Sequence, residues 1–174
     1  MVEVTELRVE SSNNMLDARW DKNEMLNKQQ IGKCGELLVQ YKLLLNGVES
    51  AHLTTDSGID LVAYSLKTKE PITIQVKANL KAKPGGGKGK LALDWWVPED
   101  SPAALVALAD LSKNRVWLLN VEEISEFAQQ HSSGRYHVYM YIDPTVKPSK
   151  AKRRVFTYEF EKFLLENRVH IYFE

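Results

Sequence analysis

The chain has 174 residues, of which 44% are hydrophobic and 26% are charged, and its formal net charge is zero. This length and composition predict one folded domain with its own core rather than a disordered chain. The zero net charge argues against a uniformly basic nucleic-acid coat, and the single cysteine, Cys34, excludes an internal disulfide or a zinc cluster of several thiolates. No apolar run is long enough to span a bilayer, so we expect a cytoplasmic protein that does not enter a membrane.

The first 27 residues are polar and predict an N-terminal arm, and the clearest helix follows over residues 29–46. Asn46 and Gly47 supply the C-terminal stop of this helix. Its apolar residues recur at alternating steps of three and four, which is typical of one helix face; they are Ile31, Cys34, Leu38, Tyr41 and Leu45.

Short apolar runs separated by turn residues predict a series of strands after this helix. The runs over residues 59–64 and 71–78 are joined by a polar turn and predict an antiparallel hairpin. Residues 81–90 contain Pro84 and three consecutive glycines and predict a flexible basic loop. Further strands are expected over residues 48–55, 91–97, 103–109, 115–119 and 136–142.

Two more helices are predicted toward the C-terminus, over residues 121–130 with Asn120 as the N-cap and over residues 160–167. The order of elements predicts an α+β fold in which a central mixed β-sheet is flanked by helices. No linker divides the chain, so we treat residues 1–174 as a single domain. Its parts are an arm over 1–27, a core over about 28–142 and a C-terminal extension over 143–174.

The hairpin carries polar side chains inside apolar runs. Asp60 lies in Gly-Ile-Asp-Leu-Val, and Gln75 and Lys77 lie in Ile-Gln-Val-Lys-Ala. An ionisable group in a buried strand is costly unless a partner compensates it. Side chains alternate along a strand, so Gln75 and Lys77 share a face, and they converge with Asp60 if it pairs opposite residue 75 or 77.

This convergence has two interpretations. Asp60 and Lys77 could form an internal ion pair with a purely structural role. Alternatively, Asp60, the amide oxygen of Gln75 and the carbonyl of Val76 could form an oxygen-only site of the kind that suits Mg²⁺. Lys77 would then stabilise negative charge that builds on a phosphorus centre.

The helix favours the second interpretation. Gly32 and Gly35 lie inside it, and each glycine there costs about 1 kcal/mol relative to alanine. Small residues at these positions would let the helix approach the sheet or a phosphate backbone closely. Glu36 could then reach the same metal directly or through water.

A helix glutamate, then Gly-Ile-Asp, then Gln-Val-Lys resembles the PD-(D/E)xK, or restriction-endonuclease-like, nuclease superfamily. The resemblance covers about residues 29–130, and the superfamily core is a helix, three antiparallel strands, a helix and a further strand. Glu36 matches the glutamate of its first helix, Asp60 its metal-binding aspartate, and Gln75 and Lys77 its third-strand motif. One position departs, because the superfamily usually has an acid where Gln75 stands. The chain would be a Gln-x-Lys variant, a form that active members also include.

The resemblance implies a Mg²⁺-dependent (or Mn²⁺-dependent) endodeoxyribonuclease that hydrolyses DNA phosphodiester bonds, commonly as a homodimer. The catalytic residues would be Glu36, Asp60, Gln75 and Lys77. The metal ligands would be Asp60, Gln75, Glu36 and the carbonyl of Val76. DNA-backbone contacts would come from Lys81, Lys83, Lys88 and Lys90, which could equally form a solvated loop.

Gln75 keeps a second class of function open, because it removes one negative charge from the expected metal site. The chain could be a catalytically inactive nuclease-fold subunit that binds DNA or supports an assembly. A third interpretation is an unrelated α+β protein in which Asp60 and Lys77 pair only for stability.

Overall fold

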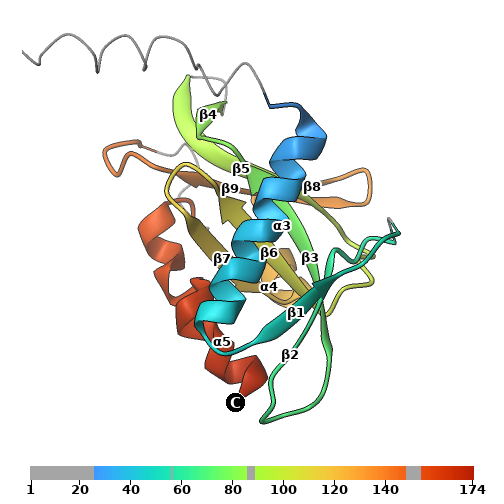
Figure 1. Cartoon of the computed structure of the whole chain (residues 1–174). Coiled ribbons are helices and arrows are strands. Elements are labelled where there is room, and N and C mark those ends of the chain that lie inside the picture. The colour runs from blue at the N-terminus through green and yellow to red at the C-terminus, as the bar shows by residue number, and fades with distance from the viewer. Residues whose placement is uncertain (1–25, 56, 86–88, 148–153) are drawn as a thin grey trace, which may run out of the picture.

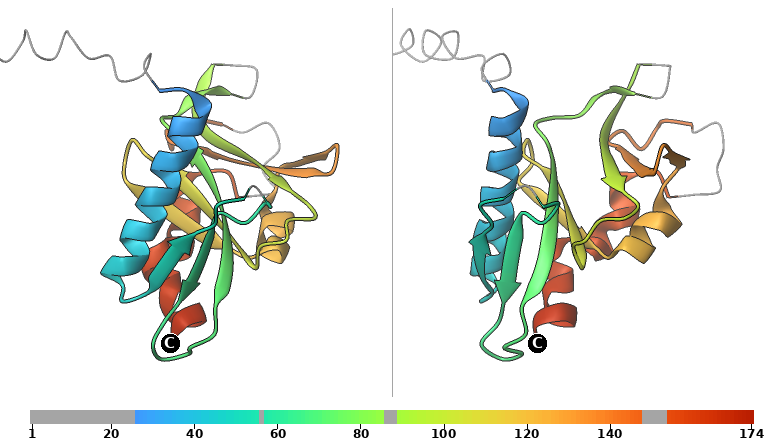
Figure 2. Two further views of the ribbon diagram at one scale, coloured as in Figure 1. Left: turned by 45° about the vertical axis from the view of Figure 1, so that its right-hand side comes forward. Right: turned by 90° about the vertical axis from the view of Figure 1, so that its right-hand side faces the viewer.

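The computed structural model describes residues 26–55, 57–85, 89–147 and 154–174. Within these residues, a long helix, a five-stranded sheet and a four-stranded sheet are stacked as successive layers (Figures 1 and 2). Most of the predicted N-terminal arm lies outside the described residues. None of the helices in the described ranges combines the length and apolarity needed to cross a membrane.

The helix predicted over residues 29–46 is confirmed as α3 (Lys28–Leu45). It begins with a capping box, in which Asn27 Oδ1 accepts a hydrogen bond from the Gln30 N–H and Gln30 Oε1 accepts one from the Asn27 N–H. It ends at Asn46, and Gly47 then takes a positive φ of 75° that favours glycine.

The buried face of α3 differs from the predicted one. Gly35, Val39 and Leu43 are buried against the sheet, whereas Tyr41 is 58% and Leu45 is 67% exposed. The predicted face followed the large apolar residues. The glycine at position 35 instead allows the backbone of α3 to lie against β3, and this close contact sets which side of the helix is covered.

The five-stranded sheet is mixed, as predicted. β1 (Glu49–His52), β2 (Leu61–Tyr64) and β3 (Ile72–Asn79) are antiparallel neighbours, which confirms the expected hairpin. β3 is parallel to β6 (Leu105–Asp110), which pairs in turn with antiparallel β7 (Arg115–Leu119). All six residues of β6 are buried, because this strand has a neighbour on both edges and a layer on both faces.

The four-stranded sheet contains the main departures from the predicted elements. Its order is β4-β5-β9-β8, and every pairing is antiparallel. The sequence predicted a loop over 81–90, but residues 83–85 form a strand because they pair with residues 90–92. Residues 86–88, between the two strands, lie outside the described residues. The predicted helix over 121–130 is α4 (Val121–Phe127), and the chain then extends into a strand. The strands are β4 (Lys83–Gly85), β5 (Lys90–Pro98), β8 (Gln130–Ser132) and β9 (Arg135–Tyr141).

Two hydrophobic clusters lie on the two faces of the five-stranded sheet. The first lies between this sheet and the helices α3 and α5 (Leu165–Phe173). The second lies between the two sheets and includes Phe160 and Phe163 of the 3₁₀ helix Thr157–Phe163. The single helix predicted over residues 160–167 is therefore wrong, because the chain changes helix type and direction at Leu164 to fill both clusters.

Candidate active site

Asp60 lies where β2 stops pairing with β3. Leu61 is opposite Ile74 in the antiparallel register, so Asp60, one residue earlier, lies opposite Gln75. The N–H of Asp60 donates to the carbonyl of Ile74 at 3.0 Å, which continues the pairing by one step. This is the register that convergence of Asp60, Gln75 and Lys77 requires.

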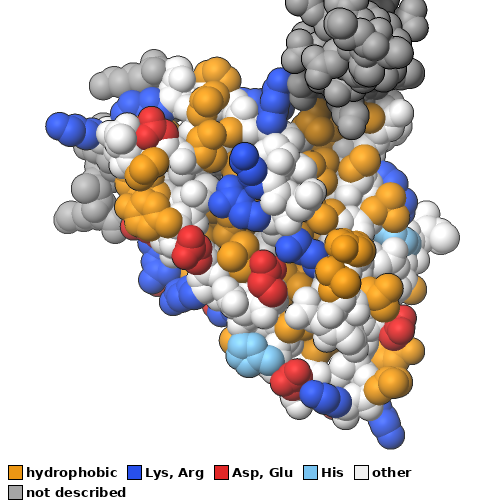
Figure 3. All heavy atoms as spheres, turned by 60° about the vertical axis from the view of Figure 1, so that its left-hand side comes forward, with side chains coloured by type: hydrophobic (Ala, Val, Ile, Leu, Met, Phe, Trp, Pro, Cys, Tyr) orange, Lys and Arg blue, Asp and Glu red, His pale blue; other side chains and the backbone are white. Residues whose placement is uncertain are grey.

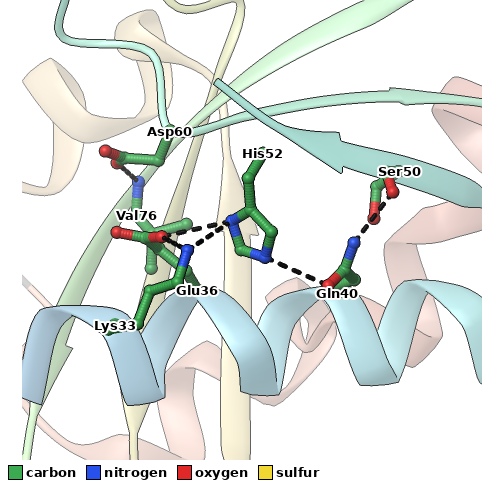
Figure 4. A network of polar contacts seen from close by, with 7 residues as sticks. All are labelled: Lys33, Glu36, Gln40, Ser50, His52, Asp60 and Val76. Carbon is green, nitrogen blue, oxygen red and sulfur yellow. Dashed lines mark hydrogen bonds and ion pairs between the residues drawn. The ribbon is translucent and has the colours of Figure 1, made fainter. Parts of the chain in front are cut away.

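The carboxylate of Asp60 caps the edge of β3 that β2 leaves uncovered. Its Oδ2 accepts a hydrogen bond of 2.6 Å from the N–H of Val76 (Figure 4). A charged acceptor strengthens such a bond. The contact fixes the carboxylate beside the middle residue of Gln75-Val76-Lys77.

The Gln75 side chain holds the turn that leads into Asp60. Gln75 is only 4% exposed, its Nε2 donates to the carbonyl of Gly58 at 3.0 Å, and its Oε1 accepts from Ser101 Oγ at 3.3 Å. Gly58 has a positive φ of 80°, so this turn favours glycine. An amide satisfies this position because the carbonyl of Gly58 requires a donor, which a carboxylate would not supply.

Glu36 reaches the same stretch of β3 from the helix side. A Cβ built on Gly35 would lie 3.4 Å from Val76 Cγ1, so α3 touches β3 at Val76, and Glu36 is the next residue along the helix. Figure 4 shows the Glu36 side chain rising from α3 toward this part of the sheet. This close helix–sheet contact brings Glu36 near Val76, the residue whose N–H is bonded to Asp60.

Glu36 belongs to a polar network that the sequence did not reveal. Its Oε2 lies 2.8 Å from Lys33 Nζ and 3.2 Å from Nδ1 of His52, which comes from β1 (Figure 4). His52 Nε2 lies 3.0 Å from Gln40 Oε1, and Gln40 Nε2 donates to the carbonyl of Ser50. Nothing in the sequence indicates that His52 and Glu36 are in contact, because only the folded structure brings β1 beside α3.

Lys77 follows on the opposite face of β3 from α3. Ile74 and Val76 belong to the cluster under α3, so alternation turns Gln75 and Lys77 toward the four-stranded sheet. Within the described ranges, the ammonium of Lys77 forms neither a hydrogen bond nor an ion pair. Among its described residues, the structure therefore does not contain the Asp60–Lys77 ion pair that the purely structural interpretation requires.

The predicted DNA-contacting lysines belong to the β4–β5 hairpin and the residues that lead into it, and Lys88 falls outside the described residues. Lys81 and Lys83 are exposed at the start of the β4–β5 hairpin, and Lys90 Nζ donates to the carbonyl of Lys147. On the face shown in Figure 3, basic and acidic side chains are interspersed with hydrophobic ones, without a continuous basic surface.

The donor set fits a divalent cation by its chemistry. Asp60 and Glu36 offer carboxylate oxygens, and Mg²⁺ sites commonly use one or two carboxylates with water completing the shell. No group of three or more His, Cys, Asp or Glu side chains in the part of the chain that the structure describes is placed to hold a metal. An ion here would therefore depend on few protein ligands.

Comparisons with known proteins bear on the fold. No protein-family model matches the chain, and no curated protein matches it. The chain is similar to the bacterial homing endonuclease I-Ssp6803I, with a TM-score of 0.54 and 14% identity over 84% of this chain and 91% of the other. It also aligns with Hjc, a Holliday junction resolvase of Archaeoglobus fulgidus, at a TM-score of 0.43 and 15% identity over 62% of this chain and 82% of the other.

The first of these likenesses shows the fold. The chain has a mixed α+β architecture, with a mixed central sheet flanked by helices, that matches a nuclease fold. The predicted fold class is confirmed. At 14% identity the likeness carries no site residue from one chain to the other.

Proposed function

We propose that this protein is a metal-dependent DNA endonuclease that hydrolyses phosphodiester bonds, a Gln-x-Lys variant of the restriction-endonuclease-like nucleases. The observation that carries the proposal is the contact between Asp60 Oδ2 and the N–H of Val76, which fixes a carboxylate beside Gln75 and Lys77. The fold shared with a homing endonuclease supports it, as does the approach of Glu36 to the same stretch of β3.

Each residue of the centre has a proposed role. Asp60 and Glu36 would hold Mg²⁺ or Mn²⁺ together with the Val76 carbonyl, and the bound ion would supply positive charge at the scissile phosphate. The Gln75 amide oxygen would join these ligands only by giving up its hydrogen bond from Ser101. Lys77 would stabilise negative charge that builds on the phosphate oxygens. Glu36, held by Lys33 and His52, would orient water for the attack.

The DNA contacts and the assembly are also proposals. Lys81, Lys83, Lys88 and Lys90 would contact the DNA backbone around the β4–β5 hairpin. We propose that the protein acts as a cytoplasmic homodimer, because cutting both strands of a duplex requires two centres.

Plasmid nicking tests the proposal. Purified full-length protein with Mg²⁺ or Mn²⁺ should nick supercoiled DNA, and Asp60→Asn and Lys77→Met should each lower the rate by about 100-fold or more. Asp60→Asn is a mild change, because the asparagine oxygen can still accept the hydrogen bond from Val76. Lys67→Met is the matched control, because Lys67 is largely exposed and pairs with Glu174 away from the centre.

Measurements of DNA affinity distinguish a variant that has lost catalysis from one that no longer binds DNA or no longer folds. Both variants should retain wild-type affinity for DNA in EDTA and a wild-type melting temperature. Failure of the wild-type protein to cut any duplex, branched or single-stranded DNA with either metal would overturn the proposal.

One observation favours a second candidate function, a non-catalytic DNA-binding or assembly subunit. Both polar atoms of the Gln75 amide are already hydrogen-bonded, to Gly58 and Ser101, so this side chain has a complete structural role without a metal. Binding of DNA without cleavage under every metal condition would identify this alternative.

A further inference from the structure

The four-stranded sheet holds a cavity of about 390 Å³ on its outer face. Residues of all four strands line it, among them Lys83, Asp94, Gln130, His137, Tyr139 and Tyr141. The volume lies in the range of about 300–1,000 Å³ that is typical of sites for small ligands. We refer to this feature as the outer-sheet cavity, and it shares no residue with the Asp60 centre.

Strand alternation explains why the cavity faces away from the core. Leu93 and Trp95 of β5 and Val138 and Met140 of β9 are buried in the cluster between the sheets. Their neighbours in sequence therefore point outward. Asp94 of β5 and His137 and Tyr139 of β9 alternate with these buried residues, so their side chains face the cavity.

Aromatic rings form a continuous row along this face. Trp96 stacks on His137 with centroids 4.2 Å apart and planes 2° apart. His137 lies 5.7 Å from Tyr139, which lies 5.4 Å from Tyr141. The Gln129 side-chain amide bonds both backbone polar groups of Tyr139, because it accepts from the N–H and donates to the carbonyl. The row lines the cavity as an aromatic wall, but the Tyr139 ring is tilted by 52° from His137 and by 65° from Tyr141, so a planar ring can stack on one of these rings at a time.

Polar groups lie beside this aromatic wall. Asp94 Oδ2 is 3.3 Å from His137 Nε2, and the Asp94 side chain remains partly exposed, so it can accept a further hydrogen bond. Lys83 places an exposed ammonium at the same cavity. Burial and the neighbouring Tyr141 raise the pKa of Tyr139, so its phenol stays neutral and adds no repulsion toward an anion.

The cavity is tied to the strand that carries the Asp60 centre. Asn79 Nδ2 donates to the carbonyl of Asp94 at 2.6 Å. Asn79 is the last residue of β3 and lies on the same face as Gln75 and Lys77. This bond places the end of β3 next to β5, one of the strands that line the cavity.

We propose that the outer-sheet cavity binds an unpaired nucleobase of a DNA strand. An aromatic wall, a carboxylate acceptor and a nearby ammonium match a planar base, its amine or ring N–H, and the adjoining phosphate. Tyr139 stacks on the base, Asp94 accepts its hydrogen bond, and Lys83 contacts the phosphate, while the buried Tyr141 supports the Tyr139 ring from behind. The inference rests on the proposed function only in taking DNA as the nucleic acid.

Fluorescence anisotropy of the full-length protein with labelled oligonucleotides in EDTA tests this site without cleavage. Single-stranded DNA should bind more tightly than a blunt duplex of the same length. Tyr139→Leu should weaken single-strand binding by about 5- to 150-fold, the range expected for loss of one base–aromatic stack. Asp94→Asn should weaken single-strand binding, because a neutral amide oxygen accepts a hydrogen bond less strongly than a carboxylate does.

Matched variants keep the test decisive. Tyr139→Phe keeps the ring and should bind as the wild type does, and Tyr158→Leu removes an aromatic ring that is 55% exposed outside the cavity and should have no effect. Unchanged single-strand binding by a folded Tyr139→Leu protein, or equal affinity for single strand and duplex, would overturn the inference. Asp60→Asn should retain this single-strand binding, because Asp60 lies outside the cavity. If the wild-type protein binds single strands but never cuts DNA, the proposed nuclease activity is refuted and the cavity assignment is not.

Discussion

Single residues at this centre have structural roles that constrain their chemistry. Asp60 was singled out because a carboxylate in an apolar run requires compensation, and the N–H of Val76 provides part of it. Gln75 stands where the nuclease superfamily that the sequence resembles usually has an acid, and its environment explains an amide: one atom donates to Gly58 and the other accepts from Ser101. These two hydrogen bonds give Gln75 a structural role in the turn that does not depend on a metal.

The substitution Gln75→Glu tests whether this side chain also faces a metal. The carboxylate would oppose the carbonyl of Gly58 at a position that is only 4% exposed, so we expect a loss of about 1–3 kcal/mol in the free energy of unfolding without metal. Mg²⁺ should then raise the melting temperature of the variant more than that of the wild-type protein, because binding to the folded state adds stability.

Differential scanning fluorimetry with and without Mg²⁺, at matched ionic strength, measures both effects. An equal response of the two proteins to Mg²⁺ would show that residue 75 does not face the ion. A higher melting temperature for the variant in EDTA would contradict the structural role assigned to the amide.

At the scale of elements, the packing of α3 on β3 brings Glu36 to the strand that Asp60 caps. The helix touches the strand at Gly35, where an added Cβ would lie 2.5 Å from Ala78 Cβ. At Gly32, one turn earlier, no atom of the described residues outside the helix backbone lies within 4 Å of an added Cβ. The two glycines looked alike in sequence, and the structure gives them different roles.

The pair Gly35→Ala and Gly32→Ala separates these roles. At Gly35 the added methyl group overlaps the partly buried Ala78, so overpacking of about 1–3 kcal/mol should outweigh the gain of about 1 kcal/mol in helix propensity. At Gly32 only the propensity gain applies, and the variant should be more stable than the wild type by up to about 1 kcal/mol.

Urea denaturation followed by circular dichroism measures both changes, and Gly32→Ala is the internal control for the helix itself. If Gly35→Ala were as stable as Gly32→Ala, the close contact between α3 and β3 would be wrong. The approach of Glu36 to Val76 would then lose its support.

At the scale of the whole molecule, the C-terminal segment joins the two clusters. Phe160 and Phe163 fill the space between the sheets, and Leu165, Val169 and Phe173 complete the cluster under α3. The hydroxyl of Ser65 also donates to the carbonyl of Phe173. The segment expected as an extension is therefore part of the packing that supports the five-stranded sheet.

Truncation of Phe173 to alanine tests this contribution. The side chain is 1% exposed, so Phe173→Ala should cost about 3–5 kcal/mol through lost burial and a cavity. Ile171, two residues earlier, is 57% exposed, and Ile171→Ala should change stability by no more than about 0.5 kcal/mol. Chemical denaturation compares them, and similar costs for both would contradict the docking of α5.

The sequence by itself determined the α+β class, the positions of α3 and most strands, and the antiparallel pairing of β2 with β3. These features depend on local periodicity, caps and turn residues, which act over a few neighbouring positions. Local signals also located Asp60, Gln75 and Lys77, because polar side chains stand out within apolar strands.

Only the tertiary structure decided which face of α3 is buried, that residues 83–85 form a strand, and that the C-terminus supplies two helical segments. It also brought His52 to Glu36 and gathered the residues of the outer-sheet cavity. The physical reason is the same in each case: these contacts join positions far apart in the chain, and the close fit of one layer against another selects them. The local pattern of apolar residues does not predict how closely the layers pack against each other.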